Sequence, residues 1–273
     1  MRLFADDCLV YRKVTTRDDQ LQLQKDLDEV SQWCATWGMK INTSKCNILR
    51  ITRAAHPIQS FYTLSGDILK EVQHTKYLGI TISNTLKWSD HISWCTKKAS
   101  SKLGFIQRNL KRCPYQLKPT AYCSLVRAGL EYSAAIWDSH QPKDVDLCER
   151  IQRRAARFVA HDYNRTTSVT KLLEELNWQP LTSRREALRL SLLYKITHGL
   201  VAVDPTEVGL VLAGQRTRSA HKYKYRAVAA RTDSYRYSMV PRTIAEWNRL
   251  PPEVVDAPSA DCFMSRIRGV QSQ

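Results

Sequence analysis

Two adjacent aspartates near the start of the chain have the setting of a metal-binding turn. Asp6 and Asp7 lie between the apolar residues 3–5 and the β-favouring residues 8–11. Carboxylates at the tip of a strand-turn-strand unit can hold divalent cations where the phosphates of a nucleotide arrive, as two-metal phosphoryl transfer requires. We therefore predict that Asp6 and Asp7 bind a divalent cation, Mg²⁺ or Mn²⁺. Because side chains alternate along a strand, Asp6 is the stronger candidate for a direct ligand.

The dipeptide alone is weak evidence for such a site. With 26 acidic residues in 273, on the order of two adjacent acidic pairs are expected by chance. Asp18-Asp19 is a second copy, but it follows Thr15-Thr16 and precedes a helical pattern. Acidic residues in the first turn are stabilised by the helix dipole, so we predict a structural role for that pair.

The sequence after these aspartates predicts a helix followed by short strands. Apolar residues recur at spacings of three and four through residues 23–37, and Gly38 then ends the pattern as a C-terminal cap. A β-rich run occupies residues 46–51, a turn at Gly66 separates further strand candidates, and residues 77–82 close the β-containing part.

The order of three motifs resembles the palm of reverse transcriptases, specifically those of non-LTR (LINE-type) retrotransposons. The motifs are Phe4-Ala5-Asp6-Asp7, Gly38-x-x-x-Asn42-x-x-Lys45 after the helix, and Tyr77-Leu78-Gly79 after the next strand. The resemblance implies that the aspartates belong to the catalytic box. It implies that the second motif is the following palm motif and that Tyr77, Leu78 and Gly79 form the primer grip.

The resemblance gives Lys45 and Gly79 functional roles that compete with simpler ones. Lys45, the third catalytic candidate, would place a positive charge or a proton near the leaving phosphate, and the alternative is a solvated lysine at a strand end. Gly79 would let the backbone approach a primer closely, and the alternative is a bulge in an ordinary strand.

The resemblance continues towards the end of the chain. Residues 178–181, Arg184-Arg185, residues 194–196 and residues 241–251 look like the family's region beyond the thumb. The family also has fingers, a first palm motif with an essential aspartate, an upstream template-gripping segment and an endonuclease domain, none of which is recognisable here. We therefore expect the C-terminal part of a reverse transcriptase, inactive when isolated.

Positive charge is concentrated beyond the predicted palm. The net charge is +16, and residues 1–90 hold 12 basic and 10 acidic residues while residues 91–273 hold 30 and 16. Such a surplus favours a polyanionic partner, most often nucleic acid. An apolar stripe from Ile92 to Leu110 predicts a thumb helix that carries nucleic-acid-binding residues along a template–primer duplex, namely Lys97, Lys98, Lys102, Arg108 and Lys111. The alternative is a solvated basic face.

Two more basic segments follow. Arg150, Arg153, Arg154 and Arg157 repeat the arrangement on a second predicted helix. Residues 216–242 hold eight basic residues, one acid and interleaved tyrosines, which favours single-strand binding with Tyr223 and Tyr225 stacking on bases. The alternative there is a disordered basic connector. Apolar residues between 244 and 267 then predict a small helical cap.

Several other classes of protein are disfavoured. The eight cysteines include no C-x-x-C pair, and His91-x-x-x-Cys95 has no matching second half for a zinc site. No secretory leader is visible, and no apolar run approaches the ~20 residues of a membrane span. We expect reduced thiols, a cytoplasmic or nuclear location, no secretion and no membrane partner.

The sequence therefore predicts an α+β protein in three parts. These are the C-terminal half of a palm over residues 1–84, a helical thumb over residues 85–160 and a basic helical region over residues 161–273. By the resemblance, it is part of an RNA-directed DNA polymerase using two-metal nucleotidyl transfer, with an RNA template, a DNA primer and deoxynucleotide triphosphates as partners. The alternatives are a non-catalytic nucleic-acid-binding remnant and, least favoured, a structural interaction protein.

Overall fold

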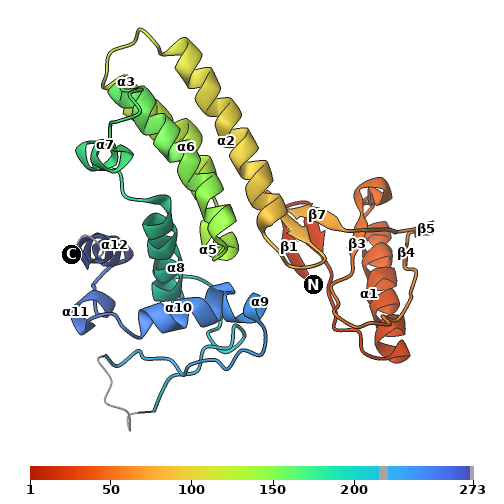
Figure 1. Ribbon diagram of the computed structural model, residues 1–273. Helices are drawn as coiled ribbons and strands as arrows, with labels where there is room; N and C mark the ends of the chain where they lie inside the picture. The colour runs from red at the N-terminus through yellow and green to blue at the C-terminus, as the bar shows by residue number, and fades with distance from the viewer. Residues whose placement is uncertain (215–220, 271–273) are drawn as a thin grey trace. The chain divides into compact units, whose positions relative to one another are not determined.

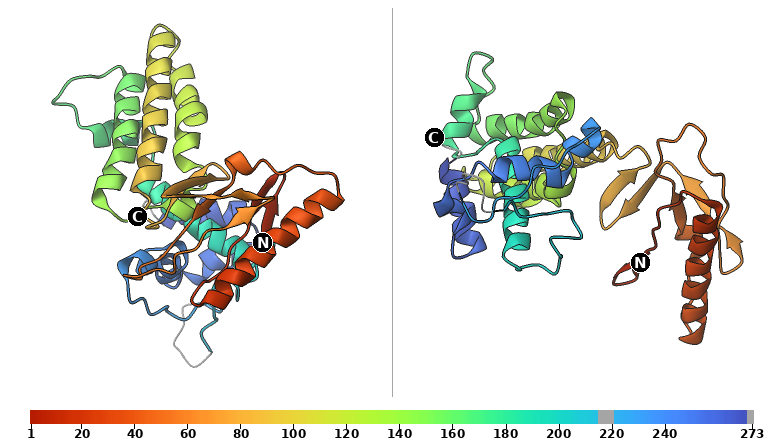
Figure 2. Two further views of the ribbon diagram at one scale, coloured as in Figure 1. Left: turned by 90° about the vertical axis from the view of Figure 1, so that its right-hand side faces the viewer. Right: turned by 90° about the horizontal axis from the view of Figure 1, so that it is seen from below.

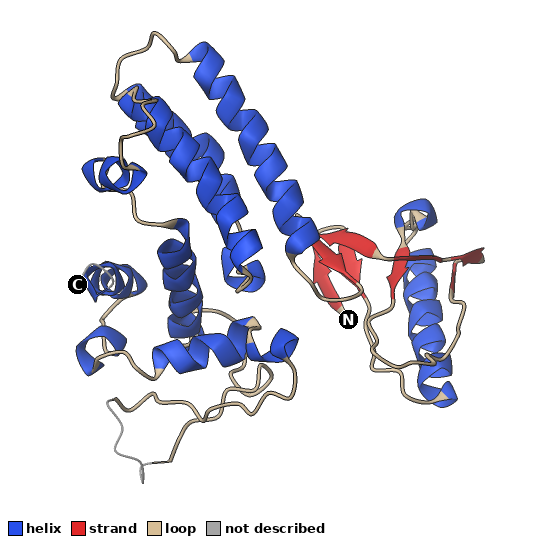
Figure 3. Ribbon diagram, viewed as in Figure 1, coloured by secondary structure: helices blue, strands red, loops and turns tan. Residues whose placement is uncertain are grey.

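The computed structural model describes residues 1–214 and 221–270, and the chain forms two compact units, Met1–Asp90 and His91–Gln273. All strands of the described residues lie in the first unit, and the second is built from helices (Figure 3). Helices and short strands together confirm the predicted α+β class. The division into palm, thumb and C-terminal region stays a prediction.

The first unit begins with a β-hairpin and a long helix. Strands β1 (Arg2–Phe4) and β2 (Asp7–Leu9) pair antiparallel, and α1 (Arg17–Thr36) follows. A capping box starts α1, in which Asp19 N–H donates to Thr16 Oγ1 over 3.1 Å and Thr16 N–H donates to the Asp19 carboxylate over 2.8 Å. Hydrogen bonds from Thr15 and Thr16 hold the pKa of Asp19 well below its usual range. The structural role predicted for Asp18-Asp19 is confirmed.

Helix α1 ends at Thr36, and Gly38 caps its C-terminus as predicted. This glycine has φ +64°, a conformation that costs a residue with a Cβ about 1–2 kcal/mol. Its N–H donates to Ala35 O over 3.2 Å, and Met39 N–H donates to Cys34 O over 2.8 Å. These two bonds make a Schellman motif, which satisfies the last carbonyls of the helix.

The remaining strands of the first unit form separate pairs. Strand β3 (Asn47–Leu49) pairs parallel with β6 (Lys70–Val72), while the antiparallel pairs are β4 (Thr63–Leu64) with β5 (Asp67–Ile68) and β7 (His74–Tyr77) with β8 (Ile80–Ser83). A small core forms where side chains of α1 pack on this layer, around Tyr62, Leu64 and Leu69.

Residues 77–82, which were predicted to close the β-containing part, contain a hairpin turn. Leu78 and Gly79 have φ +46° and +82° and form the turn between β7 and β8. Positive φ at both loop residues is the geometry of a two-residue type I′ hairpin, which matches the twist of the strands on either side. A leucine at the first of these positions gives no sequence signal for a turn, so the sequence pattern did not reveal it.

The second unit begins with α2 (Ser89–Asn109), which starts at the boundary and lies beside α6 (Pro142–Ala160), as Figures 1 and 2 show. The predicted apolar stripe of α2 is confirmed, because residues such as Ile92, Leu103 and Ile106 are at most 1% exposed. Between the two helices the chain forms α3 (Leu117–Ala121), the π-helical turn η2 (Tyr122–Arg127), α4 (Ala128–Glu131) and α5 (Ala134–Trp137).

A second core surrounds α8 (Leu181–Thr197), which follows α7 (Val169–Glu175). Helix α8 contacts α5, α6, α10 and α12. The later helices are α9 (Asp233–Arg236), α10 (Met239–Trp247), α11 (Pro252–Val255) and α12 (Ala260–Val270). Ile244, Trp247, Phe263 and Ile267 are buried there, which confirms the predicted terminal helical cap. Among the described residues, no helix combines the length and apolar character that crossing a membrane requires.

Candidate functional site

The acidic pair lies at the tip of the first hairpin. Phe4 pairs with Asp7 across the strands, which leaves Ala5 and Asp6 as the two loop residues. Ala5 has φ +51°, a conformation that glycine or asparagine adopts more readily. This strained backbone fixes Asp6 at the tip of the turn and starts β2 with Asp7, so the expected strand-turn-strand setting is confirmed.

Both carboxylates face solvent without protein partners. Asp6 and Asp7 are exposed, and neither side chain has a hydrogen bond or ion pair within residues 1–214 and 221–270. Carboxylate oxygens of this kind are the donors that Mg²⁺ and Mn²⁺ prefer. No group of three acidic, histidine or cysteine side chains suitable for a metal ion occurs in the described part of the chain. The donors therefore fit a divalent metal in kind, and two of them make only part of a site.

Contacts with α1 position the hairpin. After β2, the guanidinium of Arg12 donates to both carboxylate oxygens of Asp26 on α1, at 2.8–3.0 Å. These hydrogen bonds lower the pKa of Asp26. On the hairpin itself, burial raises the pKa of Cys8, and the nearby thiols of Cys34 and Cys46 act in the same direction. The base of the hairpin is therefore held against α1 while its tip stays open.

The motif that contains Lys45 forms a 3₁₀ turn, η1 (Thr43–Lys45), directly before β3. Thr43 Oγ1 donates to Asp67 Oδ2 over 2.6 Å, which ties the turn to β5. Lys45 is exposed, and no hydrogen bond or ion pair in the described residues joins it to Asp6 or Asp7. Its catalytic role stays a prediction.

The predicted primer grip, Tyr77-Leu78-Gly79, spans the turn of the β7–β8 hairpin. Tyr77 pairs with Ile80, and Leu78 and Gly79 form the tip. Gly79 therefore permits a tight turn, so the simpler alternative of a bulge in an ordinary strand is wrong, while a close approach to a primer is not tested. Contact between this tip and a primer stays a prediction.

The basic residues predicted for α2 lie together on its exposed face. Lys97, Lys98, Lys102 and Arg108 are exposed along the helix, and Lys111 is exposed just beyond it. The ammonium of Lys98 lies 4.9 Å from the ring centroid of Trp94. None of these cations pairs with a carboxylate in the described residues, so their charge is available to a polyanion.

The arginines of α6 are used differently. Arg150 and Arg153 both pair with Asp146, and Arg154 donates to Ser100 Oγ over 2.9 Å. Arg157 donates to backbone carbonyls of the loop that follows α6, including that of Asn164 at 2.8 Å. These contacts brace the helix and its neighbours, so α6 presents less unpaired charge than its sequence pattern indicates.

The tyrosines predicted to stack on bases are packed in the second core. Tyr225 is 4% exposed, and its hydroxyl lies 2.9 Å from Thr197 Oγ1. Tyr223 is half-buried, with its ring 4.9 Å from that of His198. Neither placement favours a stacking role, because these rings already pack against protein. Arg216 and Arg218, from the same basic segment, lie outside the described residues.

A buried ionic cluster, which the sequence did not indicate, joins the end of α5 to α8 and α10 in the second unit. Asp138 accepts from Arg185 Nε over 2.8 Å and from Arg189 Nε over 2.9 Å. Arg189 also donates to both oxygens of Glu246 on α10, at 2.6 and 3.0 Å. Arg242 donates to the carbonyl of Asp138 over 3.0 Å and lies 3.3 Å from its carboxylate. Arg185 and Arg189, which both lie on α8, are at most 2% exposed.

The sequence feature that could have revealed this cluster is a pair of arginines within an apolar helical stripe. Arg185 and Arg189 are four residues apart and continue the buried face that begins at Leu181. Arginines on such a face require buried acidic partners. Burial acts to lower the pKa of Arg189, but the hydrogen bonds and charge of Glu246 and Asp138 outweigh it and raise the pKa.

The signature-like stretch at residues 241–251 also clamps the preceding segment. Trp247 Nε1 donates to Tyr223 O over 2.8 Å. The Asn248 amide accepts from Tyr225 N–H over 3.0 Å and donates to Tyr225 O over 2.8 Å. Part of this stretch therefore holds the backbone of residues 223–225 against α10.

Comparisons with known proteins agree with the motifs. Residues 1–82 match the family described as reverse transcriptase (RNA-dependent DNA polymerase). The chain is 26% identical over 161 residues to the probable RNA-directed DNA polymerase from transposon BS of Drosophila melanogaster, a match that covers 57% of this chain and 18% of that protein. It is 25% identical over 161 residues to the RNA-directed DNA polymerase from mobile element jockey of Drosophila funebris, covering 58% and 18%.

A third relative is the retrovirus-related Pol polyprotein from type-1 retrotransposable element R1 of Nasonia vitripennis, 21% identical over 198 residues, or 65% of this chain and 56% of that protein. No solved structure matches the chain significantly. The chain spans less than a fifth of the length of the first relatives. These comparisons confirm the predicted resemblance to polymerases of non-LTR retrotransposons. The first two relatives are named as RNA-directed DNA polymerases, the enzyme class that the resemblance implied.

Proposed function

We propose that this chain supplies part of the active site and of the nucleic-acid-binding surface of an RNA-directed DNA polymerase of a non-LTR retrotransposon. The observation that carries the proposal is a pair of exposed carboxylates on a strained hairpin tip, without partners among the described residues and within the segment that matches reverse transcriptases. Its substrates would be deoxynucleotide triphosphates, added to a DNA primer on an RNA template. Residues 1–84 serve as part of the palm, 85–160 as the thumb and 161–273 as a further basic region.

Asp6 and Asp7 are the residues that would hold Mg²⁺ or Mn²⁺. Bound metal ions lower the pKa of a primer hydroxyl and neutralise charge on the departing pyrophosphate. The protein's own contribution is to aim two anionic side chains from a turn whose backbone is fixed by pairing of β1 with β2. Lys45 would add a positive charge beside the leaving phosphate, and the hairpin tip at Leu78 and Gly79 would contact the primer.

The chain by itself is proposed to be inactive. In the described residues no third carboxylate joins Asp6 and Asp7, and loss of an anionic ligand removes charge that the phosphoryl transition state requires. A polymerase segment that contributes another carboxylate would complete the site.

Primer extension on an RNA template tests the catalytic proposal. We expect no extension by the chain alone, and extension when it is fused behind the upstream polymerase segments of the jockey relative. Asp6→Asn in the fusion should abolish extension, while the matched control Asp18→Asn, in the other aspartate pair, should retain it. Full activity of the Asp6→Asn fusion, or efficient extension by the chain alone, would contradict the proposal.

The exposed basic face of α2 supports contact with a template–primer duplex. Five cations lie on or next to one helix without acidic partners in the described residues. Each phosphate that they neutralise releases close to one counterion, which makes affinity depend on salt. The same face also favours the second candidate function, nucleic-acid binding without catalysis. Under that function Asp6→Asn should leave every measured property of the chain unchanged, whereas under the first it should abolish primer extension by the fusion.

Binding of an RNA–DNA duplex at several salt concentrations tests this surface. Changing Lys97, Lys98 and Lys102 to glutamine should reduce the slope of log K against log salt by about 2–3, because each lost phosphate contact reduces the slope by roughly 0.7–0.9. The matched control changes three exposed lysines on other elements, Lys13, Lys143 and Lys171, and should leave the slope nearly unchanged. Equal effects of the two triple variants would show that general charge, and not α2, mediates binding.

A further inference from the structure

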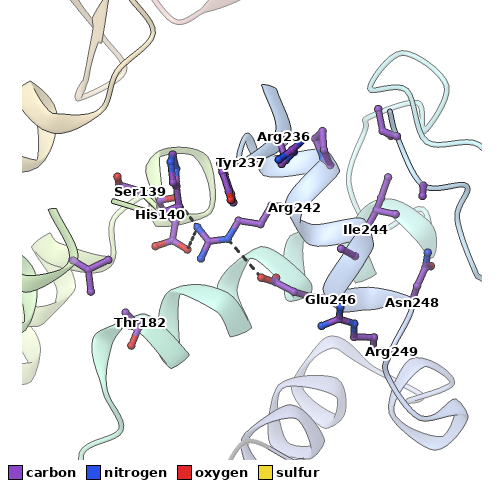
Figure 4. Close-up of a pocket in the computed structure, with 16 residues that line it drawn as sticks. Ser139, His140, Thr182, Arg236, Tyr237, Arg242, Ile244, Glu246, Asn248 and Arg249 are labelled. Atoms are coloured by element: carbon purple, nitrogen blue, oxygen red, sulfur yellow. Dashed lines mark hydrogen bonds and ion pairs between the residues drawn. The ribbon is translucent and has the colours of Figure 1, made fainter. Parts of the chain in front are cut away.

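A cavity of about 490 Å³ opens in the second unit beside α10. One wall comes from Ser139 and His140, between α5 and α6, and another from Arg236 and Tyr237, at the end of α9 (Figure 4). Helix α10 supplies the side between them, and Arg249 lies just beyond its end. Its volume is within the ~300–1,000 Å³ range of ligand pockets.

The acidic groups of this cavity are already neutralised. Asp138 is 3% exposed and accepts from two buried arginines. Glu246 pairs with Arg189 and lies 3.6 Å from Arg242, as the dashed line in Figure 4 marks. The carboxylates therefore present little free negative charge to a ligand, which disfavours a cation as the occupant.

Two arginines leave positive charge at the rim. Arg236 has a side chain 60% exposed, and its only carboxylate neighbour among the described residues is the exposed Asp233 at 3.6 Å. Arg249 is exposed and has no acidic partner in residues 1–214 and 221–270. The two residues flank α10, whose nine residues rise about 13 Å. Successive phosphates on a stacked strand rise ~3.4 Å each, so the length of this helix exceeds the rise of a single nucleotide.

An exposed aromatic pair stands at the mouth of the cavity. The rings of His140 and Tyr237 are stacked with centroids 3.9 Å apart and an interplanar angle of 15°. Both residues are exposed, so part of their aromatic surface is accessible to another planar group. Bases add to such stacks irrespective of sequence, because every base has a π-face.

We propose that this cavity binds a short single-stranded segment of nucleic acid, with one base against the His140–Tyr237 stack and phosphates at Arg236 and Arg249. Stacking rings together with two cations fit a strand better than a lone anion, which needs no aromatic surface, or an acidic peptide, which has no planar bases. The inference rests on the proposed function for the class of partner. It assigns single-strand binding to this cavity in place of Tyr223 and Tyr225.

Binding of a labelled deoxythymidine 12-mer to the full chain tests the cavity. Tyr237→Ala should weaken binding about 5- to 150-fold, the range for loss of one stacked base, with no change in salt slope. Tyr237→Trp should retain affinity. The matched control is Tyr235→Ala, which removes a tyrosine 50% exposed on the same short helix outside the cavity lining, and it should bind like the unmodified chain. Arg236→Gln with Arg249→Gln should lower the slope by about 1–1.5.

Further measurements separate failure of this inference from failure of the proposed function. Duplex binding through α2 should be unaffected by Tyr237→Ala, and thermal unfolding should show that this exposed substitution leaves the fold intact. Equal effects of Tyr237→Ala and Tyr235→Ala, with duplex binding retained, would overturn the cavity assignment alone. Displacement of the 12-mer by equimolar inorganic phosphate would also overturn it, since it would show an anion site. If neither the duplex nor the 12-mer bound at low salt, both proposals would fail.

Discussion

Replacing Asp138 with asparagine should destabilise the second unit severely. The carboxylate is 3% exposed and accepts from Arg185 and Arg189, which are 2% and 1% exposed. An asparagine oxygen can satisfy only one of these two Nε donors, and its NH₂ group then faces the other donor. The substitution also removes one of the two acids, Asp138 and Glu246, that balance three arginines.

The size of the effect follows from the geometry. Each arginine–carboxylate pair at about 4 Å between charge centres is worth roughly 4 kcal/mol at an effective dielectric constant of 20. Release of the desolvation cost of Asp138 offsets part of this, so we expect a net loss of about 3–5 kcal/mol, typical for leaving a buried charge unpaired. With urea m-values of ~1–3 kcal/mol/M, the midpoint should fall by about 1–3 M or more.

Hydrogen exchange of α8 peptides at increasing urea concentration measures this loss in the second unit alone. The matched control is Asp146→Asn, because Asp146 pairs with Arg150 and Arg153 but its side chain is 40% exposed. Surface pairs contribute about 0–1 kcal/mol, so the control midpoint should hardly move. Equal shifts for the two variants would refute the conclusion that the Asp138 cluster is a buried, mutually dependent unit.

Three further outcomes follow from the structure. Burial, and next the charge of Glu246, raise the pKa of Glu186. A carboxyl group whose pKa is raised by folding lowers stability as pH rises from its unfolded-state pKa to its folded-state pKa, so Glu186→Gln should stabilise the chain at pH 7 but not at pH 3. Thermal unfolding that showed the reverse order would contradict this expectation. Burial raises the pKa of Cys148 to about 11, so iodoacetamide at pH 8 should modify the exposed Cys262 quickly and Cys148 only on unfolding, as mass spectrometry of peptides would show. Gly38→Ala should cost about 1–2 kcal/mol through its φ of +64° alone, because no atom lies within 4 Å of the added Cβ; Gly129→Ala, with similar open space in α4, should be neutral or stabilising in the same thermal assay.

Local patterns predicted the parts of the fold that depend on neighbouring residues. The first-turn role of Asp18-Asp19, the stop at Gly38 and the buried stripe of α2 all follow from side chains a few positions apart. The acidic turn was equally local, since β-favouring residues flank Asp6 and Asp7 directly.

The parts that the sequence did not predict depend on distant residues or on strain. Asp138 meets Arg185 and Arg189 across 47 and 51 positions, so no local pattern pairs them. Leu78 adopts a positive φ that its residue type disfavours, which concealed the β7–β8 turn. Tyr225 belongs to a basic, polar segment, and its burial depends on contacts with Thr197 and Asn248 in other elements.

The clamp formed by Trp247 and Asn248 has an evolutionary consequence. Both side chains bind main-chain atoms of residues 223 and 225, which every amino acid except proline supplies in full. Attachment of this segment to α10 therefore depends on the identity of Trp247 and Asn248 more than on the identity of residues 223 and 225. At neighbouring exposed positions such as Lys222, the side chain can therefore change while the backbone of the segment stays attached to α10.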